Sequence, residues 1–325
     1  MQNPKKNSRL IVGIILIALL SGFISWQVTG ADLTNPRSNF WRVVRGGDPA
    51  YSSTPQQGHT VLIVNSGENW REIRNGFVMP FSQWVLLLAL AGIGVMYKFA
   101  GPDKLEKPRS GIRIERYGRP DRILHWYTAV LFIIMGVTGL SILLGRIFLI
   151  PVFGLWADSV WLTAAKLLHN YCGPLLLIGI VLEAIIWVKF NIPEKVDLEW
   201  IKKVTGRLRG ARPHIGRVNA GQKAWFWLVV VCGIIVGVTG VLLDFPIWDQ
   251  SRFTMQVSHV IHVVVAILFV GAAFGHIYMG SIGVEGVFEG IWHGTVDAVW
   301  AEQHTDLWYE EKVRENAEKT DAEAS

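Results

Sequence analysis

Long apolar runs separated by polar segments dominate the pattern of residues along this chain. Five runs are long enough to cross a bilayer, whose hydrocarbon core needs about 20 residues of helix: 80–99, 125–145, 164–189, 223–243 and 257–281. A helix satisfies its backbone hydrogen bonds internally, which lipid requires. The pattern therefore predicts an all-α integral membrane fold, with a four-helix bundle over 125–281 and an extra N-terminal transmembrane helix over 80–99.

A sixth, shorter run at 10–26 follows Lys5, Lys6 and Arg9. A basic start before a short apolar stretch is typical of a signal peptide, and small residues at 29–31 offer a cleavage site. Residues 1–31 are therefore predicted to be a signal peptide or a retained anchor helix. Residues 32–79, which contain Pro, Gly, Ser and Gln, are predicted to be a small extracytoplasmic segment.

Two loops carry most of the positive charge and set the predicted orientation. They are 100–124 and 191–222, with seven Lys or Arg residues each: Lys104, Lys107, Arg109, Arg113, Arg116, Arg119 and Arg122, then Lys195, Lys202, Lys203, Arg207, Arg209, Arg212 and Arg217. Positive charge beside helix ends stays cytoplasmic. We therefore expect both loops and the tail 282–325 to face the cytoplasm, in a multi-pass protein of the bacterial inner membrane.

Composition supports this interpretation. Only 18% of the 325 residues are charged, against about 25% in a typical soluble chain. The net charge of +5 lies in loops beside helices, so it marks topology and does not indicate a nucleic-acid partner. Two cysteines, Cys172 and Cys232, are too few for an iron–sulfur cluster, which must then belong to a partner. No internal repeat is evident.

Five of the nine histidines fall within or at the ends of apolar runs: His125, His169, His259, His262 and His276. Ionisable groups at membrane depth are costly, and each is by default a candidate for function. A single one could equally be a hydrogen-bonded histidine between helices. Their arrangement favours function, except for His259, which is predicted to be an interface residue near the outer edge.

His262 and His276 lie on one predicted helix, nearly four whole turns apart. At the rise of an α-helix this spacing is about 21 Å, so both lie on one face in opposite leaflets. By depth, His169 pairs with His262 (the outer pair) and His125 with His276 (the inner pair). Two imidazoles from different helices are what a b-type haem needs for its iron. The sequence thus predicts two b haems, one above the other.

One cation precedes each of two ligand candidates by three residues: Arg122 before His125 and Lys166 before His169. Residues at this spacing share a helix face, and anionic haem propionates need such partners. The alternative is that both cations merely mark helix ends.

Several motifs together resemble the cytochrome b (gamma) subunit of membrane-bound formate dehydrogenases. The resemblance covers 113–309, and the helix at 80–99 with Asn69-Trp70-Arg71 looks like the longer bacterial version of that subunit. The motifs are Asp121-Arg122-Ile-Leu-His125-Trp126, Lys166-Leu-Leu-His169-Asn, Asn191-Ile-Pro193, Asn219-Ala-Gly221-Gln222-Lys223 and His276-Ile-Tyr278-Met279.

The resemblance implies the same two histidine pairs as haem ligands, and a quinone (menaquinone or ubiquinone) beside the inner haem. It implies that Asn219, Gly221 and Gln222 contact the quinone. Amides before a helix can donate to a quinone carbonyl, but a helix cap with a tight turn explains the same residues. The implied partners are an iron–sulfur (beta) subunit and a molybdenum or tungsten catalytic (alpha) subunit, which oxidises formate.

Glu183 departs from the family pattern, which usually has an apolar residue there. It follows His169 by nearly four helical turns, so it lies on the same face and toward the inside. A buried carboxylate near the inner haem is a candidate proton relay to quinone. The alternative is an ion pair with a basic group at the interface.

Three other functions fit parts of the pattern. The first is a cytochrome b subunit of another quinone-linked enzyme, such as a hydrogenase or thiosulfate reductase. The second is a metal-ion transporter with copper or zinc at the histidines, which favours nearby sulfur ligands. The third is a structural anchor with interface histidines.

Overall fold

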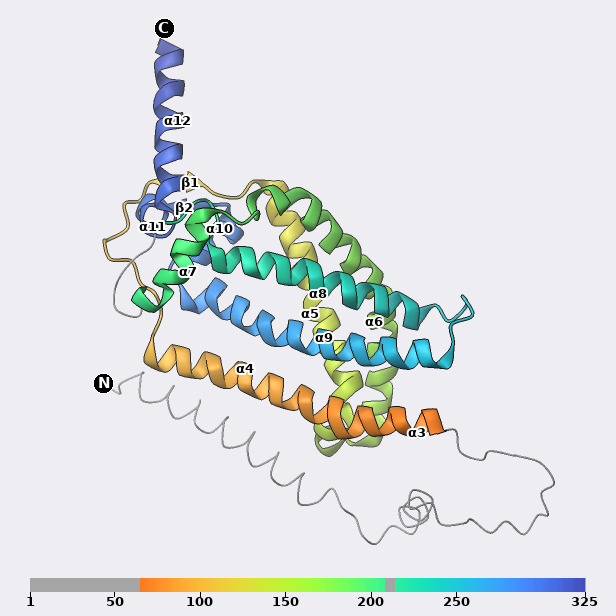
Figure 1. Cartoon of the computed structure of the whole chain (residues 1–325). Helices are drawn as coiled ribbons and strands as arrows, with labels where there is room; N and C mark the ends of the chain where they lie inside the picture. The colour runs from red at the N-terminus through yellow and green to blue at the C-terminus, as the bar shows by residue number, and fades with distance from the viewer. Residues whose placement is uncertain (1–64, 208–213, 325) are drawn as a thin grey trace, which may run out of the picture. The chain divides into compact units, whose positions relative to one another are not determined.

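A computed structural model of the protein describes residues 65–207 and 214–324 and consists mainly of long helices (Figure 1). Five helical segments are long and apolar enough to span a membrane: 69–99, 119–148, 150–190, 220–244 and 252–283. They contain α4 (Met79–Phe99), α5 (Arg119–Phe148), α6 (Ile150–Trp187), α8 (Ala220–Asp244) and α9 (Arg252–Tyr278). The predicted all-α membrane fold is confirmed.

The first described helix begins earlier than the sequence suggested. The helix α3 (Asn65–Glu72) continues through the π-helical turn η1 (Ile73–Val78) into α4, so the last part of the expected extracytoplasmic segment 32–79 is helical. Pro80 has no backbone N–H and crowds the carbonyl four residues before it, and a wider π turn directly before it accommodates both effects. The predicted signal or anchor segment 1–31 lies outside the described residues.

The second correction concerns α6, which begins at Ile150 and not near 164. A kink at Gly154, whose φ of +78° favours glycine, separates its first turn from the rest. The early part of α6 exposes Phe153, Leu155 and Trp156. Apolar side chains of this kind suit a lipid surface, so the expected short outer loop is largely replaced by helix.

The spanning helices pack in the order α5, α6, α8, α9 and α4. Their largest core cluster is formed by Leu131, Leu176, Ile180, Val229 and Phe269. The α6–α8 contact depends on Gly233 and Gly237, because a Cβ at either would lie 2.5 Å from the side chain of Ile180 or Leu177. Small residues that bring backbones together are how helices associate in lipid.

A cap covers one end of these helices. It is built from the loop after α4 together with the segment after α9, which holds the π turn η3 (Met279–Gly283), α10 (Val287–His293), α11 (Ala298–His304) and α12 (Asp306–Ala324). The strand β1 (Arg113–Glu115) pairs antiparallel with β2 (Thr295–Asp297), with Arg113 opposite Asp297. In Figure 1, α12 extends away from the rest of the cap.

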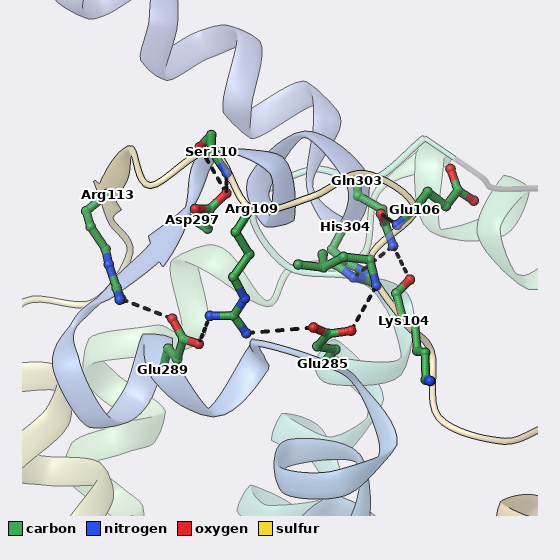
Figure 2. Close-up of polar contacts among 11 residues, drawn as sticks. Lys104, Glu106, Arg109, Ser110, Arg113, Glu285, Glu289, Asp297, Gln303 and His304 are labelled. Carbon is green, nitrogen blue, oxygen red and sulfur yellow. Dashed lines mark hydrogen bonds and ion pairs between the residues drawn. The ribbon is translucent and has the colours of Figure 1, made fainter.

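Polar contacts hold the cap together (Figure 2). Glu289 accepts hydrogen bonds from Arg109 and Arg113, and its bond with Arg109 raises the pKa of that guanidinium. Burial opposes ionisation of Asp297, but hydrogen bonds from the N–H groups of Ser110, Val299 and Gly111 outweigh it and hold the carboxyl pKa below its usual range. Asp297 is thus the N-cap of α11 and the anchor of the incoming loop.

The second basic loop lies at the same end. It follows the 3-10 turn η2 (Val188–Phe190) and contains α7 (Lys195–Arg207), and the N–H of Leu307 donates to Ile215 O at 3.2 Å. The buried ammonium of Lys223 is held by Asp197 at 2.8 Å and Glu194 at 3.2 Å. Both basic loops and the C-terminal segment therefore meet on one side, as the charge pattern predicts.

Candidate haem sites

The structure brings together the two histidine pairs that depth predicts. The ring centroids of His169 on α6 and His262 on α9 are 6.2 Å apart. Those of His125 on α5 and His276 on α9 are 6.4 Å apart. Three helices thus supply four imidazoles, and α9 contributes one to each pair.

These separations fit two imidazoles on opposite sides of one iron. A bond from a metal to an imidazole nitrogen is about 2 Å long, and that nitrogen lies about 1.1 Å from the ring centre. Two axial imidazoles therefore have ring centres about 6.2 Å apart. Both observed distances agree, so the donor set fits a haem iron whose four other ligands are the porphyrin nitrogens.

The rings of the outer pair are each held by a threonine and face a glycine. Thr138 Oγ1 lies 2.9 Å from His169 Nδ1, and Thr239 Oγ1 lies 3.1 Å from His262 Nδ1. A Cβ on Gly139 would lie 3.0 Å from His169 Cε1, and one on Gly240 3.2 Å from His262 Cε1. A side chain at either position would require the imidazole ring to shift by a few tenths of an ångström.

Sequence reasoning did not single out the two threonines, Thr138 and Thr239, although a signal was present. Gly-Val-Thr-Gly occurs at 136–139 in α5 and again at 237–240 in α8. This short repeat corrects the expectation that the chain has none. Each copy faces a histidine on the helix that follows it, His169 on α6 or His262 on α9.

The inner pair has different surroundings. The indole of Trp225 stacks on His276 with centroids 4.5 Å apart and planes 7° apart. Trp126 contacts His125 edge to face at 5.3 Å. His125 Nδ1 is buried and finds no hydrogen-bond partner among the described residues. The inner imidazoles are thus positioned by aromatic rings, whereas the outer imidazoles are positioned by threonine hydroxyl groups.

Aromatic side chains also fill the space between the two pairs. Phe269 lies on α9, midway along the sequence between His262 and His276. It is buried and contacts Phe132 of α5, with ring centroids 4.7 Å apart. The residues packed between the sites on α5 and α9 are therefore apolar.

The cap fixes the start of α5 and with it His125. The N–H groups of Arg116 and Tyr117 donate to Gly294 O, at 2.8 and 3.2 Å, and Arg122 Nη1 donates to Trp292 O at 2.9 Å. Gly294 has a φ of +90°, and a Cβ there would lie 2.9 Å from Tyr117 O. A cavity of about 390 Å³ lies beside these contacts, lined by Arg119, Arg122, Ile123, Trp126 and Trp292.

The two propionate candidates differ in setting. Arg122 faces that cavity, and its Nε is buried without a partner among the described residues. Lys166 is exposed on α6, one turn before His169.

The structure places Asn219, Gly221 and Gln222 in a capping box at the start of α8. Asn219 Oδ1 accepts from Gln222 N at 2.8 Å, and Asn219 N donates to Gln222 Oε1 at 3.1 Å. Both amide oxygens are engaged, while no hydrogen bond within the described residues uses either amide nitrogen. Trp200 of α7 lies against Gly221, where a Cβ would be 3.4 Å from its ring. The turn is therefore a helix cap in which, among the described residues, the side-chain amide nitrogens of Asn219 and Gln222 donate no hydrogen bond.

Glu183 is buried on α6, with 7% of its surface exposed. Its carboxyl group lies beside the hydroxyl of Thr128 on α5, and it forms no ion pair among the described residues. The alternative of an ion pair at the interface therefore finds no partner in this part of the chain.

The other described histidines have separate contacts. His259 lies edge to face with Trp70 at 5.3 Å. In the cap, His214 Nδ1 lies 2.5 Å from Asp306 and His304 Nδ1 lies 3.9 Å from Asp103.

A comparison with protein families agrees with this geometry. The sequence model of the family described as "Prokaryotic cytochrome b561" matches residues 116–294, which include all four paired histidines. The chain belongs to this cytochrome b561 family. A b-type haem is therefore its cofactor, and its role is redox electron transfer in the membrane.

Individual relatives indicate which members of the family this chain resembles. The cytochrome b556 subunit of the nitrate-inducible formate dehydrogenase of Escherichia coli K12 is 30% identical over 211 residues, 62% of this chain and 93% of that protein. The formate dehydrogenase cytochrome b556 subunit of Haemophilus influenzae is 30% identical over 218 residues, covering 64% and 87%. The resemblance to formate dehydrogenase cytochrome b subunits is confirmed.

The glycines facing the outer pair give a direct test of this cytochrome. We expect Gly139→Val to displace the His169 ring and to lower the haem content per polypeptide, because the added carbons overlap the imidazole. Gly136→Val is the matched control, since a Cβ at Gly136 meets nothing within 4 Å. Haem is measured as pyridine haemochrome on purified full-length protein. Equal haem in both variants would contradict this role of Gly139.

Proposed function

We propose that this chain is the di-haem cytochrome b subunit of a formate dehydrogenase complex. It carries electrons from an iron–sulfur subunit on the outer side, through two b haems, to a quinone near the cytoplasmic face. The observation that carries the proposal is the pair of histidine couples, each with the ring separation of axial ligands, whose members His262 and His276 share one face of α9.

Each bound haem supplies a reversible one-electron centre, and the chain's residues hold and separate the two. His169 and His262 would hold the outer iron, and His125 and His276 would hold the inner one. The Phe132–Phe269 contact places apolar side chains between the two pairs. Arg122 and Lys166 pair with propionates, Arg122 from the cavity at the start of α5.

The start of α8 is proposed as the quinone site. The capping box fixes both side chains by their oxygens and presents the amide nitrogens of Asn219 and Gln222 as donors to a quinone carbonyl. Gly221 keeps the backbone accessible there. The site is near the inner pair, because Trp225, one turn further along α8, stacks on His276. The positive end of α8 stabilises negative charge developing on the quinone oxygen.

Quinone reduction consumes protons, and Glu183 is the proposed relay. Its carboxyl group lies on α6 beside Thr128, three residues after His125. Burial without a counter-charge among its described neighbours favours the protonated form of the carboxyl group, so Glu183 is proposed to hold a proton and to pass it on when a base accepts it.

Formate is oxidised on a separate molybdenum or tungsten subunit in this proposal, with an iron–sulfur subunit between it and the outer haem. The names of the relatives in E. coli and H. influenzae favour formate over the substrates of a hydrogenase or a thiosulfate reductase. The catalytic subunit that copurifies with the chain decides between these enzymes. A metal-ion transporter fits less well, since the described residues contain no group of three or more His, Cys, Asp or Glu side chains that could hold a metal ion.

The haem count tests the central proposal. We expect two low-spin b haems per chain in a reduced-minus-oxidised spectrum of the purified protein. His169→Ala or His262→Ala should remove one haem, and His125→Ala or His276→Ala the other, because each variant takes an axial ligand from one iron only. His259→Ala is the matched control on the same helix and should keep both. A single haem in the wild type would refute the di-haem assignment.

Two isosteric variants separate the quinone contact from the helix cap. Asn219→Asp and Gln222→Glu keep the capping oxygens but remove the donor nitrogens, so α8 should fold normally. We expect quinone reduction by the complex to fall about tenfold or more, as expected when a hydrogen bond to a developing charge is lost. Reduction of both haems by dithionite should be unchanged. Normal turnover with quinone would show that the box is a cap only.

For the proton relay, we expect Glu183→Gln to lower the rate of quinone reduction while haem content and haem reduction stay normal. Glutamine keeps the size and the hydrogen-bonding capacity of the side chain but cannot carry a proton. The rate is measured in the assembled complex with a soluble quinone analogue. Turnover equal to wild type would end the relay hypothesis.

A further inference from the structure

The hydroxyl groups beside the outer pair have a defined direction. Thr138 Oγ1 donates to Ile134 O at 2.7 Å, and Thr239 Oγ1 donates to Ile235 O at 2.7 Å. A hydroxyl group has one proton, and each of these is committed to the carbonyl of the preceding helical turn. Towards the imidazoles, each oxygen can only accept.

It follows that Nδ1 of His169 and of His262 carries a proton and donates it to threonine. The other nitrogen, Nε2, is then left with its lone pair, which is the form that binds a metal. A hydroxyl oxygen whose own proton is already donated is also a better acceptor. The two Thr-Gly steps therefore set the tautomer and the position of both outer rings, Thr by hydrogen bonding and Gly by leaving space.

The inner pair has no such arrangement among the described residues. His125 Nδ1 finds no hydrogen-bond partner there, and the close neighbour of His276 is the face of Trp225. An acceptor on the second nitrogen makes a metal-bound imidazole more basic. More basic axial ligands favour the oxidised iron, so second-sphere hydrogen bonds are one means of adjusting a haem potential.

We propose that Thr138 and Thr239 are positioning residues that accept hydrogen bonds from both outer imidazoles and make the outer haem harder to reduce than the inner one. The inference rests on the di-haem part of the proposed function. It gives the direction of electron transfer a structural cause, since an electron arriving on the outer side then moves to the more easily reduced centre.

The experiment is an optical redox titration of the full-length protein, with Thr138→Val and Thr239→Val compared with wild type. Valine keeps the shape and removes the acceptor. We expect the outer haem to become about three- to tenfold easier to reduce, which is about 28–59 mV at 59 mV per tenfold change for one electron. The inner haem should not shift. The outer wave is the one missing from His169→Ala.

The two variants should differ in size of effect. The backbone carbonyl of Val236 also lies near the His262 ring, so an acceptor remains close to that ring in Thr239→Val. His169 has no comparable second acceptor among its described contacts. Thr138→Val should therefore give the larger shift, and Thr138→Ser, which restores the hydroxyl, should return the outer potential to the wild-type value.

Thr163→Val is the matched control. Thr163 Oγ1 also donates to the carbonyl four residues before it, Ser159 O at 2.9 Å, but it is exposed on α6 and contacts no paired histidine. Loss of the outer haem from Thr138→Val, with retention in Thr138→Ser and Thr163→Val, would also support the hold on the ring. Full haem content with both waves at wild-type potentials would overturn the inference. A wild type with one haem would instead refute the di-haem proposal itself.

Discussion

An imidazole inside hydrocarbon needs a partner for each of its two nitrogens, because a buried polar group without one costs about 1–3 kcal/mol. The four imidazoles lie in pairs on facing helices, at a separation that would let an iron satisfy one nitrogen of each ring. At the outer pair, threonine hydroxyl groups are the partners of the second nitrogen. The helix contacts follow from it. Glycines at Gly233 and Gly237 bring α6 and α8 together, while Gly139 and Gly240 leave room for rings and not for helices. Small residues thus serve two purposes in one bundle, and only their neighbours distinguish them.

The cap shows how the position of a membrane histidine can depend on contacts outside the membrane. His125 lies near the start of α5, where few helical turns anchor it. The cap supplies the missing support through Gly294, which receives two backbone hydrogen bonds from the chain entering α5, and through the bond from Arg122 to Trp292 O. The ion pairs of Figure 2 are exposed, and each alone stabilises little. Asp297 is different, because one buried carboxylate holds both the incoming loop and the start of α11.

The sequence predicted the pairing of His169 with His262 and of His125 with His276, because a spacing of nearly whole helical turns survives any detail of packing. It also predicted five spanning helices and placed the end of each within three residues, whereas several of them begin earlier than predicted. It failed where local chemistry is ambiguous. Residues 65–79 look polar, yet they continue the helix because a π turn accommodates Pro80. The start of α6 was missed because Gly154 reads as a break, although it only kinks the helix. The role of Thr138 and Thr239 was not predicted, because threonine in a membrane helix usually hydrogen-bonds only its own backbone. In addition, nothing in the sequence indicates which helix face meets a histidine.

The same ambiguity affects Asn219 and Gln222, whose side chains could form a helix cap or contact a ligand. The structure shows that the two roles are compatible. A capping box and a ligand site are usually alternatives for the same side chains. An amide, however, has an acceptor end and a donor end, and the box uses only the acceptors. Fixing the oxygens removes the rotational freedom that a donor on a flexible side chain would lose on binding a quinone carbonyl. The cap therefore prepares the contact and does not compete with it. The outer threonines work by the same logic, since each commits its proton to the backbone and thereby offers only its oxygen to a ring.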